Sequence, residues 1–207
     1  MATLALVSLC VIIGVISAQQ PAPCATPVQL AMRASQYNHE DDVMNRFFIA
    51  YDAVNKRKVI FEEENVLMPG RQLHEFLILN NVNIEYDFNM KTKECRKSIP
   101  RPWRPFGIPS NATFEDEFYI GGPGEEVFAQ DWSDRVPYSR REMWIGTFSL
   151  KHCYPIREVL VAGEQVNTSI TTNFHDIVDG IPNPGDFIPP PECEQAKWGI
   201  STRTYPW

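Results

Sequence analysis

The chain has 207 residues, of which 43% are hydrophobic and 22% are charged, and a formal net charge of −7. That length is enough for one domain with its own apolar core. The acidic balance argues against nucleic acid and anionic membranes as main partners, because both attract basic surfaces. The densest basic cluster, Lys56-Arg57-Lys58, is expected to be a solvated hairpin turn.

Residues 1–18 form an apolar leader without charged side chains, and it ends at Ala18 before Gln19-Gln20-Pro21. This pattern is typical of a secretory signal peptide, whereas a membrane span needs roughly 20 apolar residues. Cys10 lies inside the leader and is expected to leave with it. We therefore expect a signal peptide over 1–18, one domain over 19–207 with no transmembrane segment, and secretion to the extracellular space.

Short β-strands are predicted along most of the mature chain, because apolar and polar residues alternate with the period of a half-buried strand. The expected strands cover residues 28–37, 46–51, 58–64, 76–79, 83–90, 114–120 and 126–132. In the segment 83–90 the alternation predicts two faces. Ile84, Tyr86, Phe88 and Met90 are expected to point inward, and Asn83, Glu85, Asp87 and Asn89 outward.

Residues 141–178 have the clearest strand pattern and predict a three-stranded antiparallel meander. Trp144, Gly146 and Phe148 share one parity in its first strand, and the second covers 158–162. In the third, Ile170 and Phe174 alternate with residues that are wholly polar. A helix would not bury such a set on one side.

Two proline-rich stretches interrupt the strand pattern. The first, 99–109, contains four prolines and is excluded from a central strand, so we expect an ordered loop that bridges two parts of the sheet. The second, 180–191, is expected to be a stiff loop leading to Cys193, with a short helix over 193–198. Together these elements predict an all-β sandwich or open barrel.

Four cysteines remain after the leader, namely Cys24, Cys95, Cys153 and Cys193. An even number behind a signal peptide predicts two disulfides, for which three connectivities exist. The sequons at Asn111 and Asn167 predict N-linked glycans, and Asn167 lies on the polar parity of its strand.

Catalytic and metal-binding motifs are weak in this sequence. It has no GxSxG elbow, and its four histidines lie in four different elements, so we expect no enzymatic activity. Acidic residues cluster at 39–42, at 115–117, and at Asp176, Asp179 and Asp186. Such oxygen ligands suit an extracellular calcium ion, although EF-hand spacing is absent and solvated acids are commoner. No cofactor is required by any motif.

The inward parities are unusually aromatic, with Tyr86, Phe88, Trp144, Phe148 and Phe174 among them. These rings predict either a packed core or the lining of a cavity for an apolar ligand. The residues alone favour the packed core.

Several motifs occur together and in order: Cys24-Ala-Thr-Pro, the strands FFIAYD and KVIFEE, Cys95 before PFGIP, the GGPGEE turn, CYP at Cys153, and 187–193. In this set the chain resembles the ependymin family. The resemblance implies an antiparallel β-sandwich, or an open half-barrel of two curved sheets with an apolar pocket, similar to bacterial lipoprotein carriers. It also implies a secreted or lysosomal glycoprotein, a homodimer and calcium binding.

The resemblance further implies the disulfides Cys24–Cys153 and Cys95–Cys193, and it moves the cavity ahead of the packed core. Some relatives have a further cysteine pair that this chain lacks. The implied function is a secreted glycoprotein that binds fatty acids or other lipids as a carrier or sensor. The alternative is an adhesion glycoprotein that interacts with extracellular matrix or cell surfaces and has no transport role.

Overall fold

Short strands dominate residues 21–135, 143–162 and 168–201, which are the residues that the computed structural model describes. The strands are β1 Gln29–Asn38, β2 Val43–Asp52, β3 Arg57–Glu64, β4 Gln72–Leu79, β5 Ile84–Asn89, β6 Cys95–Ser98, β7 Thr113–Ile120, β8 Val127–Ser133, β9 Trp144–Ser149, β10 Pro155–Leu160, β11 Ile170–Asp179 and β12 Lys197–Trp198. Two 3₁₀ helices, η1 Pro184–Phe187 and η2 Pro191–Cys193, complete this part of the chain. The predicted all-β class is confirmed. The predicted signal peptide lies outside the described residues.

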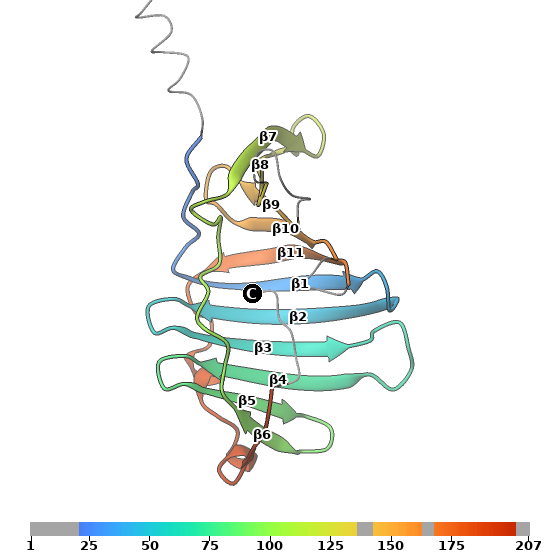
Figure 1. Ribbon diagram of the computed structural model, residues 1–207, viewed down its shortest axis with the longest axis vertical. Coiled ribbons are helices and arrows are strands. Elements are labelled where there is room, and N and C mark those ends of the chain that lie inside the picture. The colour runs from blue at the N-terminus through green and yellow to red at the C-terminus, as the bar shows by residue number, and fades with distance from the viewer. Residues whose placement is uncertain (1–20, 136–142, 163–167, 202–207) are drawn as a thin grey trace, which may run out of the picture.

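All of these strands belong to one open sheet with the order β12-β6-β5-β4-β3-β2-β1-β11-β10-β9-β8-β7 (Figure 1). Strands β1–β6 form one antiparallel meander and β7–β11 form another. Strand β1 pairs with β2 along one edge and with β11 along the other, which satisfies its backbone groups on both sides. The two curved sheets that the family resemblance implied are therefore two halves of one continuous sheet.

The predicted meander over 141–178 is confirmed as β9, β10 and β11, which neighbour one another in the sheet. The predicted hairpin is confirmed as β2 and β3. Strand β6 was not predicted, because its four residues include Arg96 and Lys97 and show no apolar alternation. The helix expected over 193–198 is wrong. Its place is taken by η2 and by β12, which pairs in parallel with β6.

The chain must cross one face of the sheet after β6, because β6 lies near one edge and β7 forms the other. Residues 99–112 make this crossing and run in front of the strands in Figure 1. We call this segment the strap. Its prolines lack a backbone N–H and suit an extended segment outside the hydrogen-bonded ladder. The predicted bridging loop is confirmed.

Both faces of the sheet are covered. On the face beneath the strap, which we call the strap face, buried side chains form one cluster with Trp103 and Phe106 of the strap; they are Leu30, Met32, Ala34, Phe47, Ile49, Tyr51, Ile60, Phe76, Ile78 and Phe174. On the opposite rear face, Val59 and Leu77 pack against Phe187 of η1.

Two disulfides, Cys24–Cys153 and Cys95–Cys193, hold peripheral segments to the sheet. They are the two pairs that the family resemblance implied. The first joins the N-terminal segment to the turn after β9, where the Thr26 hydroxyl also donates to the Cys153 carbonyl over 3.1 Å. The second joins β6 to η2 on the rear face.

Candidate functional site

The five aromatic residues that were predicted to line one pocket are divided between the two faces. Trp144, Phe148 and Phe174 lie on the strap face. Tyr86 pairs with Leu77 and, like Phe88, lies on the rear face. The prediction of one shared pocket is therefore wrong for Tyr86 and Phe88.

The same register corrects the polar residues of β5. Asp87 pairs with Phe76 and Glu85 with Ile78, so these two acids share the strap face with the main apolar cluster. Glu85 is buried rather than outward-facing. Alternation along a strand separates two faces, and it identifies the solvent side when only one face is covered.

Trp144 and Phe148 belong to a cluster with Trp132 at the β8–β9 end of the strap face, where Ile108 of the strap also packs. Gly146 lies between their rings, whose centroids are 6.5 Å apart. A Cβ at Gly146 would lie 2.5 Å from the Trp144 ring and 2.7 Å from the Phe148 ring. Any side chain at this position would therefore force one of the two rings to move.

Phe174 belongs to a second aromatic group formed by the strap and β2. Trp103 stacks on Tyr51 with ring centroids 5.4 Å apart, and Phe106 meets Tyr51 edge-on at 5.1 Å. Phe106 also meets Phe174 edge-on at 6.1 Å, and its backbone N–H donates to the Tyr51 hydroxyl over 3.2 Å. Aromatic packing thus holds the strap against the sheet.

Lys58 points into this aromatic group from β3 and is only 4% exposed, so the expected solvated turn is wrong for this residue. Its Nζ lies 4.8 Å from the ring centroid of Trp103 and 5.4 Å from that of Phe106, and it donates to the Arg104 carbonyl over 3.2 Å. Burial lowers the pKa of Lys58 to about 8, although the negative charge of Glu158 opposes this shift. The sequence signal for its position is that Lys58 and Ile60, two residues apart, share one face of the same strand.

Glu158 brings a carboxylate to the same face from β10. Its Oε1 accepts a 2.6 Å hydrogen bond from Trp144 Nε1. Its Oε2 is buried and has no hydrogen-bond partner within the described part of the chain. Burial raises the pKa of Glu158 to about 7, while the Trp144 hydrogen bond and the positive charge of Lys58 oppose that rise.

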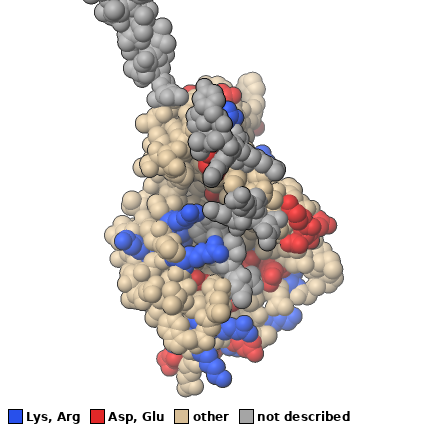
Figure 2. All heavy atoms as spheres, in the orientation of Figure 1, with Lys and Arg blue, Asp and Glu red and all other residues tan. Residues whose placement is uncertain are grey.

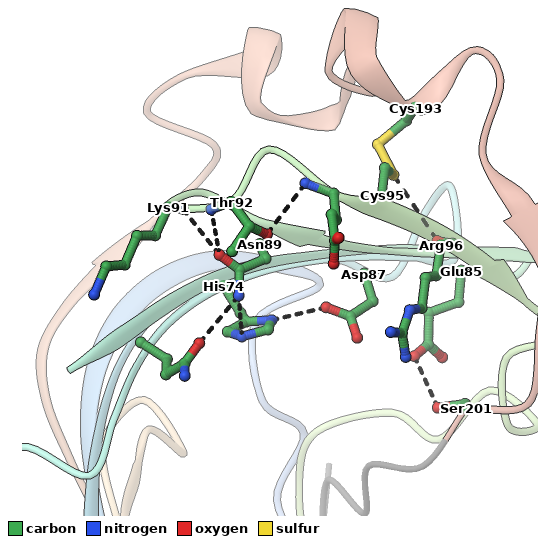
Figure 3. A network of polar contacts seen from close by, with 12 residues as sticks. His74, Glu85, Asp87, Asn89, Lys91, Thr92, Cys95, Arg96, Cys193 and Ser201 are labelled. Carbon is green, nitrogen blue, oxygen red and sulfur yellow. Dashed lines mark hydrogen bonds and ion pairs between the residues drawn. A yellow bond between two sulfur atoms is a disulfide. The ribbon is translucent and has the colours of Figure 1, made fainter. Parts of the chain in front are cut away.

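A polar network lines the β4–β5–β6 end of the strap face (Figure 3). His74 Nδ1 lies 2.9 Å from Asp87 Oδ1, and His74 Nε2 lies 3.2 Å from Asn89 Nδ2. Figure 3 shows His74 and Asp87 on one side of the sheet and the Cys95–Cys193 disulfide on the other. The hydrogen bonds of His74 in the described residues go to Asp87 and Asn89, and they orient the imidazole ring.

Several of the acidic residues considered for calcium make other contacts. Across 21–135, 143–162 and 168–201, no three His, Cys, Asp or Glu side chains are placed to hold a metal ion. Glu40 instead accepts from the Ser169 backbone N–H over 2.6 Å, and Asp176 lies 3.6 Å from Arg33. Asp42 accepts from the Tyr37 hydroxyl.

The two predicted glycosylation sites differ in what the structure describes. Asn111 is exposed at the end of the strap, immediately before β7, and Asn167 lies outside the described residues.

A shallow polar hollow of about 280 Å³ lies at the β3–β4 loop, lined by residues 64, 65 and 68–72, away from the aromatic groups. None of the helices in the described ranges is long and apolar enough to cross a membrane.

The sequence has clear relatives. Residues 69–193 match the family model described as Ependymin. Mammalian ependymin-related protein 1 of Mus musculus is 36% identical over 178 residues, which cover 86% of this chain and 79% of the relative. Ependymin-1 of Oncorhynchus mykiss is 24% identical over 154 residues, which cover 72% of this chain and 67% of the relative.

Two solved structures are similar in fold. An uncharacterized conserved protein from Thermus thermophilus superposes with a TM-score of 0.52 and 11% identity, covering 85% of this chain and 91% of that one. A LolA superfamily protein from Nitrosomonas europaea gives a TM-score of 0.41 and 10% identity, covering 75% and 87%. The first likeness supports a shared fold, and the second is more distant.

Proposed function

This chain belongs to the ependymin family, and from that premise we propose that it is a secreted glycoprotein that binds fatty acids or other lipids as a carrier or sensor. The observation that carries the proposal is the strap face. A broad apolar face of one open sheet is covered there by an extended segment instead of a second sheet. Apolar surface gains roughly 25 cal/mol for each Å² removed from water, so an acyl chain is a suitable occupant of such a face.

The strap is attached in a way that suits ligand exchange. Its contacts with the sheet include the Tyr51 ring and the Phe106 N–H bond to the Tyr51 hydroxyl, together with the 2.7 Å bond from Asn80 Nδ2 to the Arg101 carbonyl. These are side-chain contacts rather than a backbone ladder, so the strap is able to shift without breaking the sheet. An acyl chain would replace part of this aromatic packing with its own apolar contacts to the same rings.

Saturable binding of a fluorescent fatty acid is therefore expected, and organic-solvent extraction of the purified protein should release lipid that mass spectrometry identifies. Trp103→Ala should weaken binding by about tenfold, because the loss of roughly 1.4 kcal/mol of contact is a factor of ten in Kd. Trp198→Ala is the matched control, since Trp198 is 63% exposed and lies on β12.

A protein that melts normally, shows no saturable binding and releases no lipid would contradict the carrier function. That result would favour the alternative, an adhesion glycoprotein that uses its outer surface to bind extracellular matrix or cell surfaces.

Glycans are expected at Asn111 and Asn167 if the chain passes through the secretory pathway, either to the medium or to the lysosome. Each Asn→Gln variant should then remove one glycan and increase electrophoretic mobility by one step. Unchanged mobility of the wild-type protein after glycosidase treatment would contradict this expectation.

A homodimer is the proposed assembly, because β7 ends the sheet and its outer backbone groups form an edge that proteins usually cover. Light scattering at micromolar concentration should give twice the mass of the mature chain. The monomer mass alone, measured across that concentration range, would rule the dimer out.

A further inference from the structure

Lys58 is a buried cation that the fold leaves with spare hydrogen-bonding capacity. An ammonium group has three N–H donors. Within the described residues, Lys58 Nζ donates one hydrogen bond, to the Arg104 carbonyl, and otherwise faces the rings of Trp103, Phe106 and Tyr51. Aromatic faces attract a cation but do not accept its hydrogen bonds as an oxygen does. The site therefore suits a ligand that brings an anionic oxygen acceptor.

Glu158 supplies the second polar group. It projects from the strap face of β10, and its Oε2 is buried without a partner among the described residues. A buried carboxylate oxygen without a donor is costly, and protonation removes that cost. The protonated carboxyl group then becomes a donor, so Glu158 is able to hydrogen-bond to the same kind of acceptor as Lys58.

Charge around the two groups also favours an anion. The pKa of Lys58 responds to the charge of Glu158, and the pKa of Glu158 to the charge of Lys58. The guanidinium of Arg104 acts on both, while Trp144 Nε1 adds a neutral donor. Arg104 is exposed on the strap. Figure 2 shows Lys and Arg side chains gathered on the side of the molecule where the strap runs in Figure 1.

We propose that Lys58 anchors the carboxylate of a single-chain fatty acid on the strap face, and that Glu158 takes up one proton from solvent as that carboxylate binds. The proposal deepens the proposed lipid binding and rests on it. The bound state then holds one ammonium, one carboxylate of the ligand and one neutral carboxyl group, so the buried charges cancel. The acyl chain lies against the aromatic groups of the same face.

Binding of the fatty acid should consequently weaken as the pH rises. Burial raises the pKa of Glu158 to about 7, so below that value the proton is already present and above it the proton must be taken up. The expected loss is about tenfold in affinity for each pH unit above 7. Burial lowers the pKa of Lys58 to about 8, and loss of its charge above that value acts in the same direction.

The test measures dodecanoate and dodecanol as competitors of a bound fluorescent fatty acid at pH 6.5 and pH 8.5. The wild-type protein should bind dodecanoate at least about tenfold more tightly than dodecanol at pH 6.5, and should lose most of that preference at pH 8.5. Lys58→Met should abolish the preference at both values. Glu158→Gln, which keeps an acceptor for Trp144, should retain the preference and bind dodecanoate with a much weaker pH dependence.

Lys97→Met is the matched control, since Lys97 Nζ also lies over a ring, 5.6 Å from the centroid of Tyr86, but on the rear face. It should behave as wild type. Equal dodecanoate-to-dodecanol ratios in the wild-type protein and Lys58→Met would overturn the anchor while leaving lipid binding intact. Absence of binding for both competitors and for the probe would overturn lipid binding itself. The pH dependence in the wild-type protein needs no variant, so a Lys58→Met protein that misfolds does not remove the test.

Discussion

Replacing both Cys24 and Cys153 with alanine is expected to lower the free energy of unfolding by about 5 kcal/mol, on the chain-entropy account of disulfide stabilisation. The two residues are 129 positions apart, so the bond removes a large closed loop from the freedom of the unfolded chain. It also holds the N-terminal segment where Gln130 Nε2 donates to Cys24 Sγ over 3.0 Å. Urea denaturation of the double variant, at neutral pH and without reductant, measures the loss.

The Cys95–Cys193 pair is the appropriate comparison, because its separation of 98 residues predicts nearly the same loss. The two double variants should therefore unfold at similar urea concentrations, both well below the wild-type protein. A loss under about 1 kcal/mol for Cys24→Ala with Cys153→Ala would contradict the expectation.

Asp52→Ala is the second change with a large expected effect, about 3–5 kcal/mol, because it removes one partner of a buried polar cluster. Asp52 is fully buried at the end of β2. Its carboxylate accepts from Gln29 Nε2 at 3.1 Å, from Asn55 Nδ2 at 2.7 Å and from Arg57 Nε at 2.8 Å. Without this carboxylate, the side chains of Asn55 and Arg57 lose their hydrogen-bond acceptor at the β2–β3 turn. Equilibrium unfolding against Glu125→Ala, an exposed acid in the β7–β8 turn, measures the difference.

The Asp52 carboxylate should also account for part of the stability that the protein loses at acid pH. Burial alone would raise the pKa of Asp52, but hydrogen bonds from Asn55, Gln29 and Arg57 outweigh it and lower the pKa from 3.8 to about 2. A lowered pKa means that the stabilisation is present above pH 3.8 and is lost as the pH falls toward 2. Between pH 4 and pH 2 the wild-type protein should lose more stability than Asp52→Asn. If the free energy of unfolding fell equally with pH in the two proteins, Asp52 would not be a source of the acid sensitivity.

The positions of most strands follow from the sequence, because a strand that packs on one side has a period of two and its turns carry recognisable residues. The meander over 141–178 and the hairpin of β2 and β3 were predicted in this way and are present. The strap was predicted as a bridging loop for a similarly local reason, since proline has no N–H to place in a ladder. Local rules missed β6, because four residues with charged side chains carry no periodic signal.

Tertiary structure decided which face each side chain joins. Alternation assigns Tyr86 and Asp87 to opposite faces, but it does not say that the strap covers one face and η1 the other. The pairing of β1 with β11 makes two meanders into one sheet, and it joins residues such as Ala34 and Phe174 that are far apart in the chain. Lys58 and Glu158 share the strap face for the same reason. Their strands β3 and β10 belong to different meanders, so their mutual effect on pKa depends on long-range pairing that no local pattern encodes.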